Sequence, residues 1–474
     1  GDRIALEHQA GDHLGTYAGQ FGGGRRGLFQ IFQLTPQAGF GLLQAFDRAH
    51  SLRATEATIE SDVVVVGAGP GGSATAAHLA RRGLHVTLLE KVTFPRDKVC
   101  GDGLTPRAVK QLIRLGIDVS EEAGWKHTEG LRIHGGRIAP FVLPWPELAD
   151  YPNFGMVCRR TVLDERLARH AESQGVTLVE GANVTDPILD PSGRICGVRT
   201  SDGTEYSAPV VVAADGNSSR LGLAMGLHKR DDRPMGVAVR AYYRSALSDS
   251  RNLESWLELW DGAPQKSDLL PGYGWAFPEG DGTVNIGLGM LDSSAAFGRT
   301  DYRSLMKRWL SHLPAEWTLD EEHREGPIRG AALPMAFNRQ PHYRDGLLLV
   351  GDAGGMVNPF NGEGIDYAME AGEMAADAIA EAHYRGHRTP AAEKALQGYP
   401  RALQRHFGGY YRLGTIFVRL IGDPRVMKMC TTYGLPRRRL MKFVNKLLAN
   451  LTDARSGDLD DRIINTLTRI VPSL

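Results

Sequence analysis

Short runs of apolar residues that end in glycine-rich turns are the most regular feature of the sequence. Val63–Val66 leads into Gly67–Gly72, "APVVVAADG" ends at Asp215–Gly216, and "DGLLLVGDAGG" contains Gly351–Asp352. Continuous apolar runs rich in β-branched residues are typical of strands that are buried on both faces. Alanine-rich stretches follow the first and third runs and predict helices. This order of strand, turn and helix predicts an α/β fold.

The pattern of apolar and polar positions changes between these runs. Residues 236–290 contain alternating stretches such as "GVAVRAYYR" and "TVNIGLGML", which predict a second sheet. The segments "TPRAVKQLIRLGI" and "RTVLDERLARHAESQG" have the periodicity of helices. The first 58 residues have ten glycines and little periodicity, so we expect a flexible extension or a chain start foreign to the functional protein.

The first glycine turn has the residues of a dinucleotide site. Gly67 permits the tight turn, Gly69 leaves room for a pyrophosphate, and Gly72 allows the helix to pack closely on the strand. Glu90 lies 18 positions after Gly72, where a carboxylate can accept hydrogen bonds from an adenosine ribose. NAD and FAD both fit this unit, and a plain glycine turn without a ligand is the alternative.

The later turns favour FAD over NAD. FAD has a ribityl chain that must be held beyond the pyrophosphate, and Asp352 at a strand end is suited to accept a ribitol hydroxyl. Gly362 and Gly364 precede the helix predicted near Ile365, so free backbone amides there can face the pyrimidine edge of the flavin. The alternative is that these two glycines only begin a helix.

Composition narrows the class of protein. Lys and Arg total 55, as do Asp and Glu, so no global charge favours nucleic acid. The four cysteines lack C-x-x-C and Cys/His spacing, which predicts neither a disulfide scaffold nor a metal site and fits a reducing cytosol. No apolar run reaches the roughly 18 residues of a membrane-spanning helix, and no signal peptide is evident.

Several segments together resemble a known family. "VVVVGAGPGG", "ADGNSSRLG" and "LLLVGDAGGMVNPFNGEGIDYAMEAG" are similar to the three FAD fingerprints of para-hydroxybenzoate hydroxylase-type flavoproteins. "FPRDKVCGDGLTPRAV" and "LPGYGWAFPEGDGTVNIGLG" resemble the geranylgeranyl reductase family, in particular its bacterial branch that reduces a double bond in the isoprenyl tail of menaquinone. The resemblance covers about residues 60–455 and implies FAD as the cofactor.

The resemblance implies an α/β (α+β) fold class. A discontinuous Rossmann-like FAD-binding domain is expected with a β-sheet substrate domain and a C-terminal helical region. The expected boundaries are 1–58 for the extension, 59–105, 152–228 and 330–385 for the FAD-binding domain, 106–151 and 229–329 for the substrate domain, and 386–474 for the basic helical region.

The resemblance also assigns cofactor-binding residues. It places the ADP half of FAD at the first turn and the following strand end, the ribitol at the third turn, and the ring at the start of the next helix. The residues are Gly67, Gly69, Gly72, Glu90, Lys91, Arg160, Asp215, Gly351, Asp352, Gly362 and Gly364.

The family's aromatic block, P-x-x-Y-x-W-x-F-P followed by G-x-G, is matched at Tyr273, Trp275, Phe277, Pro278, Gly287 and Gly289. Its leading proline is replaced by Leu270, and Pro271 follows one position later. The resemblance therefore does not fix the backbone conformation at this point. Tyr273 and Trp275 alternate on a predicted strand, so both rings face one side and suit a polyprenyl chain lying beside a flavin. The alternative is that this aromatic stripe belongs to the core of a sheet.

Reduction of an isolated alkene needs a hydride on one carbon and a proton on the other. Cys100 is the predicted proton donor, with Tyr273 in reserve. Arg96 and Lys98 precede Cys100 in the sequence and are expected to lower its thiol pKa from roughly 8.5. The alternative is that Cys100 is a small buried hydrophobe.

The implied function is an FAD-dependent oxidoreductase that saturates a C=C bond in a polyprenyl lipid or quinone, such as a menaquinone tail or a geranylgeranyl group. No second G-x-G-x-x-G unit is present, so the electron donor is expected to be NADPH bound transiently or a protein. The alternatives are a flavin monooxygenase or halogenase of the same fold, and a flavin-bearing lipid-binding protein without turnover.

A basic amphipathic segment lies near the C-terminus, at residues 436–451. We expect it to contact the inner face of the cell membrane from the cytoplasm, and packing on the FAD-binding domain is the alternative. Its apolar face comprises Leu440, Val444, Leu447, Leu448 and Leu451, and its cations are Arg437, Arg438, Arg439, Lys442 and Lys446.

Overall fold

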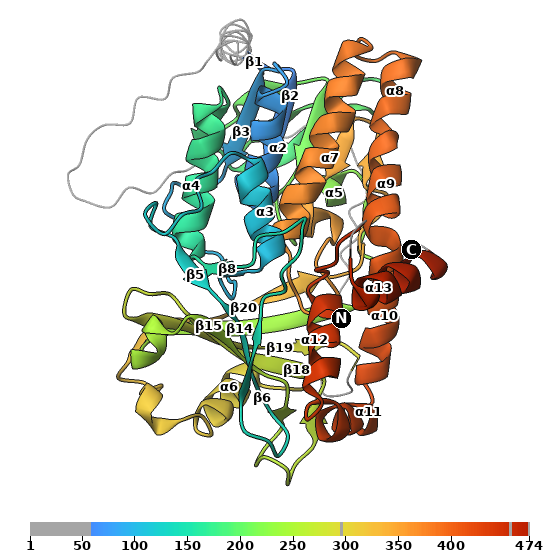
Figure 1. The fold of residues 1–474 in the computed structure, drawn as a ribbon. Coiled ribbons are helices and arrows are strands. Elements are labelled where there is room, and N and C mark those ends of the chain that lie inside the picture. Colours follow the sequence, from blue (N-terminus) through green and yellow to red (C-terminus); the bar gives the residue numbers. More distant parts are fainter. Residues whose placement is uncertain (1–57, 294–296, 455–456, 473–474) are drawn as a thin grey trace, which may run out of the picture. The chain divides into compact units, whose positions relative to one another are not determined.

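The computed structural model describes residues 58–293, 297–454 and 457–472, and Figure 1 shows its ribbon. These residues belong to one compact unit, Glu56–Leu474. The extension expected over residues 1–58 lies outside the described residues, except for residue 58.

The three apolar runs meet in a central sheet of six strands. Its order is β21-β22-β13-β2-β3-β9, and every neighbouring pair is parallel except β21 and β22. The apolar runs are buried at every residue, as expected for a parallel sheet covered on both faces. The bounds are β2 (Val63–Val66), β3 (Val86–Glu90), β9 (Thr177–Glu180), β13 (Val210–Ala213), β21 (Tyr343–Arg344) and β22 (Leu347–Leu349).

Helices cover one face of this sheet, and a smaller sheet covers the other. Val63 and Val65 pack among the helices, whereas Val64 and Val66 pack toward the small sheet, because neighbouring side chains of a strand alternate in direction. The helices are α2 (Pro70–Ala80), α3 (Pro106–Arg114), α4 (Arg160–Ser173) and α7 (Ile365–Tyr384). The small sheet comprises β1 (Ile59–Glu60), β12 (Glu205–Ser207), β11 (Ile195–Thr200) and β10 (Val184–Leu189).

A second sheet has seven strands, which are antiparallel except for the pair β15 and β6. Helix α6 (Tyr302–Leu310) packs on one face of it. Its order is β20 (Arg324–Pro334), β14 (Met235–Arg244), β19 (Thr283–Leu291), β18 (Gly272–Pro278), β15 (Asn252–Trp256), β6 (Gly130–His134) and β7 (Phe141–Pro144).

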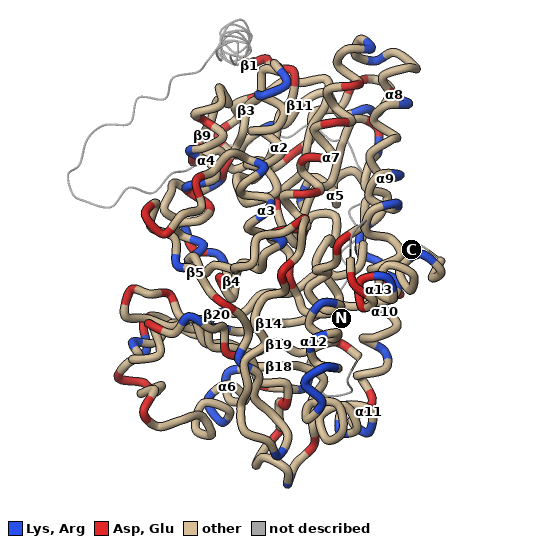
Figure 2. Tube along the Cα trace, in the orientation of Figure 1, with Lys and Arg blue, Asp and Glu red and all other residues tan. Residues whose placement is uncertain are grey.

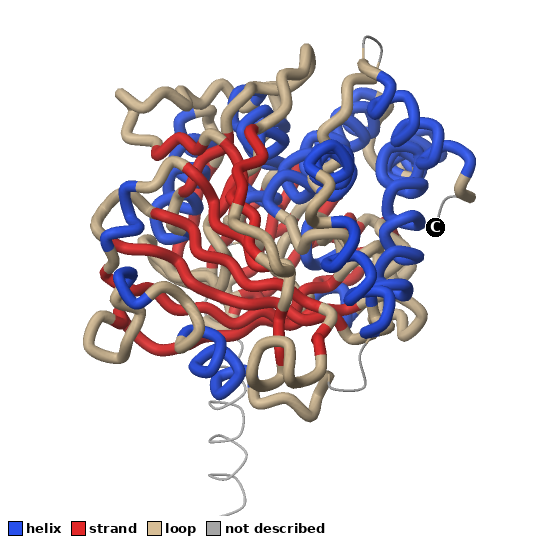
Figure 3. Tube along the Cα trace, turned by 60° about the horizontal axis from the view of Figure 1, so that its bottom comes forward, coloured by secondary structure: helices blue, strands red, loops and turns tan. Residues whose placement is uncertain are grey.

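The last part of the chain is helical and lies beside the second sheet (Figure 3). Leu435 and Met441, from the end of this region, pack with Ile133, Phe141 and Leu143 of β6 and β7. The helices are α8 (Pro390–Leu396), α9 (Gly398–Leu403), α10 (Gly409–Ile421), α11 (Pro424–Met429), α12 (Arg438–Leu448) and α13 (Leu459–Ile470), with π-helical turns at Gln404–Gly408 and Cys430–Gly434.

The remaining elements are short. They are β4 (Gly103–Leu104), β5 (Lys126–Thr128) and β8 (Gly155–Val157), β16 (Leu259–Trp260) and β17 (Leu269–Leu270), α5 (Arg220–Ala224), and the 3₁₀ turns η1 (Ala246–Asp249), η2 (Ala315–Trp317) and η3 (Gly351–Gly354).

The predicted mixed α/β fold class is confirmed. All strands of the six-stranded sheet come from the segments predicted for the FAD-binding domain. Two elements do not follow the predicted division: β20 continues past residue 330, and α3 packs in the core of the first sheet although residue 106 begins the predicted substrate segment. The domain boundaries stay a prediction.

Candidate functional site

A cavity of about 1180 Å³ joins the three glycine turns to β18, β19 and α12. The turns lie together because the carboxyl ends of the parallel strands β2, β13 and β22 share one edge of the sheet. Gly72 is the one predicted cofactor-binding residue that does not line the cavity. The predicted residues that line it are Gly67, Gly69, Glu90, Lys91, Cys100, Arg160, Asp215, Tyr273, Trp275, Gly351, Asp352, Gly362 and Gly364.

The first turn is tightly packed on its inner side and open toward the cavity. A Cβ at Gly72 would lie 1.8 Å from the carbonyl oxygen of Gly67, so no larger residue fits there. A Cβ at Gly69 would meet no atom closer than 3.7 Å, and the nearest atoms belong to the guanidinium groups of Arg96 and Arg160. Two cations beside an open turn at the N-terminus of α2 suit a pyrophosphate, so the turn fits the ADP part of FAD.

Glu90 lies beside this turn and helps to position its cations. Its Oε2 accepts a hydrogen bond from the Ala68 backbone N–H at 3.0 Å and lies 3.2 Å from Arg96 Nη2. Asp164, fully buried, is 2.8 Å from Arg96 Nη1 and accepts two hydrogen bonds from Arg160, at 2.6 and 2.8 Å. The two carboxylates therefore fix both guanidinium groups at the edge of the cavity.

Two further carboxyl groups line the cavity at the ends of strands. Asp352 lies in η3 directly after β22, and its Oδ2 is 3.6 Å from Lys98 Nζ. Asp215 follows β13; burial raises the pKa of its carboxyl, and its Oδ1 has no hydrogen-bond partner. A buried oxygen with free acceptor capacity suits a ligand hydroxyl, which is consistent with a cofactor that has a sugar or ribitol chain.

A buried network holds the loop that contains Cys100. Asp102 has φ +65°, and its Oδ2 accepts hydrogen bonds from Tyr242 Oη (2.5 Å) and Asn285 Nδ2 (2.7 Å). Asn285 Nδ2 also donates to the Cys100 carbonyl oxygen at 2.9 Å, and Trp275 Nε1 donates to Asn285 Oδ1 at 3.0 Å. The network thus ties the cysteine loop to the aromatic strand. Sequence reasoning missed Asp102 as a positioning residue, although its place between two glycines was a usable signal.

The expected lowering of the Cys100 pKa is wrong. Burial raises the pKa of the thiol, and Arg160 only partly opposes this effect. Arg96 is paired with Glu90 and Asp164, and Lys98 is paired with Asp352, so neither cation lowers the thiol pKa as predicted. The cysteine nevertheless lines the cavity, and its role as proton donor stays a prediction.

Tyr273, Trp275 and Phe277 form an aromatic wall along β18. Their successive ring centroids are 5.9 and 6.2 Å apart, and all three side chains line the cavity. Gly287 on the paired strand is required for this wall, because a Cβ there would lie 2.2 Å from the Trp275 ring. Gly101 lies on the other side, where a Cβ would be 3.2 Å from Phe277. The G-x-G and C-G-D-G motifs therefore make room for the aromatic rings.

Helix α12 closes the far side of the cavity with apolar side chains, among them Met441, Val444 and Leu448. The expected apolar face is thus turned mainly toward the protein, and Leu451 is fully buried. Lys446, predicted as a membrane-facing cation, is buried and lies 3.1 Å from Asp458 and 2.6 Å from Asp461. The prediction for Lys446 is wrong because its ammonium group is paired with two acids inside the protein. The pattern of α12 alone could not show this, since both acids lie beyond the helix in the sequence.

No metal site was predicted, and within the described residues one cluster of possible ligands lies apart from the cavity. His383 Nδ1 is 3.0 Å from His387 Nε2 and 3.8 Å from Asp62 Oδ1. A hydrogen bond between the two imidazoles accounts for the short distance. Among the described helices, none has the length and apolar character needed to cross a bilayer.

Comparison with known sequences identifies similar proteins. A family model described as "FAD binding domain" matches residues 60–401. The menaquinone reductase of Mycolicibacterium smegmatis is 35% identical over 410 residues, which are 86% of this chain and 95% of that protein. Digeranylgeranylglycerophospholipid reductase 1 of Methanosphaera stadtmanae is 30% identical over 336 residues, 70% of this chain and 78% of that protein.

Solved structures show the same fold. A geranylgeranyl bacteriochlorophyll reductase-like protein from Thermoplasma acidophilum has a TM-score of 0.66 at 22% identity, covering 87% of this chain and 97% of that one. A flavin-dependent brominase has a TM-score of 0.63, also at 22% identity, covering 86% of this chain and 98% of that one. At this level of identity, reductases and halogenases share the architecture, and the residues of the cavity must distinguish them.

Proposed function

Since the chain belongs to the FAD-binding family of oxidoreductases that includes the menaquinone reductases, and FAD is therefore its cofactor, we propose that it reduces a C=C bond in a polyprenyl chain. The substrate class would be a polyprenyl quinone such as menaquinone, or a lipid with geranylgeranyl groups. The proposed electron donor is NADPH bound transiently or a protein.

One observation carries the proposal: the glycine turn at residues 67–72, which fits FAD, and a region lined by apolar side chains belong to the same cavity. Beyond the aromatic wall, the lining is contributed by β6, β7, β15 and α12 and is mostly aliphatic, including Leu131, Ile133, Leu143, Leu253 and Val444. A prenyl chain has no polar groups to pair, so an aliphatic and aromatic lining matches it along its length. A phenol or a halide would need polar partners, and these four elements contribute two polar side chains to the lining, Ser255 and Asn445, against a majority of aliphatic ones.

The residues of the chain would then act in three ways. Gly69, Arg96 and Arg160 would hold the pyrophosphate, and Asp352 the ribitol. Tyr273 and Trp275 would lie against the alkene and exclude water from it. When bound and reduced, FAD supplies the hydride, and an acid in the cavity must supply the proton that completes the reduction.

A reduced polyprenyl product is the expected result of a direct assay. The purified holoenzyme is reduced anaerobically with dithionite and mixed with a polyprenyl quinone. The mass of the extracted lipid is then measured by mass spectrometry. We expect a gain of two hydrogens per reduced bond. Asp352→Ala should retain less FAD and form less product, and both should recover partly with added FAD.

Other outcomes of this assay would contradict the proposal. A brominated or hydroxylated product, formed only with oxygen and with bromide or a phenol, would indicate a halogenase or a monooxygenase. Bound FAD and bound quinone without any change in mass would indicate a lipid-binding protein without turnover.

We also propose that the region around α12 contacts an anionic membrane, although most of the apolar face of this helix is turned toward the cavity. Four exposed apolar side chains, Leu420, Met429, Tyr433 and Leu440, belong to segments that line the cavity. Figure 2 shows Lys and Arg along α12, and Arg437, Arg438, Arg439 and Lys442 are exposed there. Each cation near an anionic surface adds on the order of 1 kcal/mol of attraction. Such a contact would let a membrane-held tail enter the channel.

Binding to anionic liposomes is therefore expected at low salt and should be lost at high salt. The triple variant Arg438→Glu, Arg439→Glu and Lys442→Glu should stay in the supernatant after pelleting. A matched triple change to Glu at the exposed Lys394, Arg401 and Arg405 should pellet like the wild type. Wild-type protein that stays in the supernatant with anionic vesicles at low salt would rule out the contact.

A further inference from the structure

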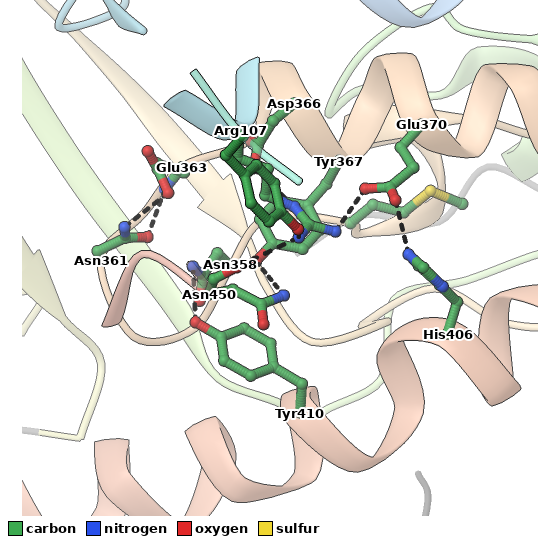
Figure 4. Close-up of polar contacts among 12 residues, drawn as sticks. Arg107, Asn358, Asn361, Glu363, Asp366, Tyr367, Glu370, His406, Tyr410 and Asn450 are labelled. Carbon is green, nitrogen blue, oxygen red and sulfur yellow. Dashed lines mark hydrogen bonds and ion pairs between the residues drawn. The ribbon is translucent and has the colours of Figure 1, made fainter. Parts of the chain in front are cut away.

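Three acidic residues at the start of α7 form a row that begins at the cavity (Figure 4). Glu363, Asp366 and Glu370 follow one another at intervals of three and four residues, so they lie along one side of the helix and the loop before it. Glu363 lines the cavity, Asp366 is 1% exposed, and Glu370 contacts the exposed ring of His406. The row thus connects the cavity with the surface.

The cations near this row are too few to balance it. Arg107, from α3, is the buried cation, and its Nη2 lies 2.5 Å from Glu370 Oε2. Its Nε is 3.4 Å from Asp366 Oδ2, and neither of these two atoms has a hydrogen-bond partner. Glu370 also accepts a hydrogen bond from His406 at 2.6 Å. Glu370 is therefore the ionised member, and the remaining two acids share too little positive charge for both to ionise.

Glu363 has polar neighbours that orient it without neutralising it. Asn361 Nδ2 donates to its Oε2 at 2.7 Å, and Tyr273 Oη donates to the carbonyl oxygen of Asn361 at 2.7 Å. The groups that face Glu363 from the packed elements are Arg107 and Thr105 near α3, Asp366 on α7, Tyr273 on β18 and Tyr410 on α10. Arg107 is the one permanent cation among them, and it is held by Glu370.

The protonation of these acids follows from their burial. Burial raises the pKa of Glu363 to about 7, and the hydrogen bond from Asn361 opposes this rise only in part. Burial, followed by repulsion from Glu363, raises the pKa of Asp366 well above its usual range. A general acid works best when its pKa is near the working pH, a condition that Glu363 meets and the Cys100 thiol, with its raised pKa, does not.

We propose that Glu363 is the acid that protonates the alkene, and that Asp366 behind it holds a second proton. The inference rests on the proposed function. In the reduction, the π bond is lost and two C–H bonds form. One carbon takes a hydride, with its two electrons, from the reduced cofactor. The other takes the proton of Glu363, whose O–H bond breaks and leaves a carboxylate. Asp366 returns a proton to Glu363, and one proton from solvent restores the pair.

Glu363→Gln tests the catalytic part, because it keeps the size and the contact with Asn361 but has no acidic proton. The dithionite-reduced variant is mixed anaerobically with a polyprenyl quinone in a single turnover, and product is measured by mass spectrometry. We expect product to form about 10²-fold more slowly than in the wild type, with normal FAD content. Glu363→Asp should restore part of the rate. The control is Glu373→Gln, which changes another acid of α7, the partner of Arg114 in α3, and should match the wild type.

Cys100→Ser in the same assay separates Glu363 from the predicted donor. The proposal expects Cys100→Ser to form product faster than Glu363→Gln. A slow Cys100→Ser together with a fast Glu363→Gln would assign the proton to the cysteine and overturn the proposal. Wild-type protein that forms no reduced product would instead overturn the proposed function, and the catalytic role with it.

The pH dependence of the free energy of unfolding tests the protonation of Glu363 in the absence of substrate. Glu363 has a folded pKa raised above its unfolded value of roughly 4.3, so its contribution to stability is present below that value and is lost as the pH rises through about 7. The free energy of unfolding of the wild type in urea should therefore fall between these pH values, and Glu363→Gln should remove this part of the fall. Identical pH profiles for the two proteins would contradict a protonated Glu363.

Discussion

Gly72→Ala is expected to prevent the protein from folding. The new methyl group would lie 1.8 Å from the Gly67 carbonyl oxygen and 3.1 Å from Ala214 Cβ. Both neighbours belong to the chain at the ends of the central strands β2 and β13, so relief requires α2 to move away from the sheet. We expect a loss of more than about 4 kcal/mol in the free energy of unfolding, measured as lost soluble expression or as urea unfolding of what remains.

Two other glycine variants show whether the effect comes from the close contact. Gly398→Ala should be nearly neutral, because a Cβ there meets no atom within 4 Å. Gly69→Ala should fold, because its nearest neighbours are 3.7 and 3.9 Å away, but should retain less FAD since the methyl group faces the cavity. A Gly72→Ala protein with wild-type stability would contradict the close packing of α2 on β2.

Arg107→Met is expected to lower the free energy of unfolding by about 3–5 kcal/mol at pH 7, because it leaves buried carboxyl groups without their cation. Burial acts to raise the pKa of Glu370, but Arg107 and the hydrogen bond from His406 outweigh it and hold this pKa at about 2. Arg114→Met, which removes the more exposed ion pair with Glu373 from the same helix, should cost less than about 1 kcal/mol.

The cost of Arg107→Met should depend on pH. The folded pKa of Glu370 is below its unfolded value of roughly 4.3, so its ion pair stabilises the fold above that pH and is lost as the pH falls toward about 2. Urea unfolding at pH 7 and at pH 3 should therefore show a smaller difference between variant and wild type at the lower pH. An equal difference at both would mean that the aliphatic stem of Arg107, rather than its charge, carries the effect.

Features that depend on neighbouring residues could be predicted from the sequence. The strand, glycine turn and helix around Gly67 were predictable because turn geometry and helix packing set the residue types locally. The alternation of Tyr273 and Trp275 placed both rings on one side of a strand, and the structure places both in the cavity wall.

Features that depend on residues distant in the sequence could not be predicted. The prediction for Cys100 considered only Arg96 and Lys98, whereas burial and the partners of these cations set the thiol pKa. Lys446 was counted as a surface cation because Asp461 lies outside the helix pattern. The acidic row of α7 has a regular spacing, but its meaning depends on Arg107, which lies on another helix and 263 positions before Glu370 in the sequence.

The contact of α12 with the second sheet has a consequence for biosynthesis. Ile133, Phe141 and Leu143 pack against Leu435 and Met441, and Leu435 is synthesised 292 residues after Leu143 (435 − 143). Until Leu435 and Met441 are made, the nascent chain exposes the apolar side chains of β6 and β7, and it can aggregate or bind chaperones through them. A chain truncated shortly before residue 435 could still form the dinucleotide-binding turn, but the apolar side chains of β6 and β7 would stay exposed. We therefore expect such a chain to be degraded by proteases rather than to accumulate with reduced activity.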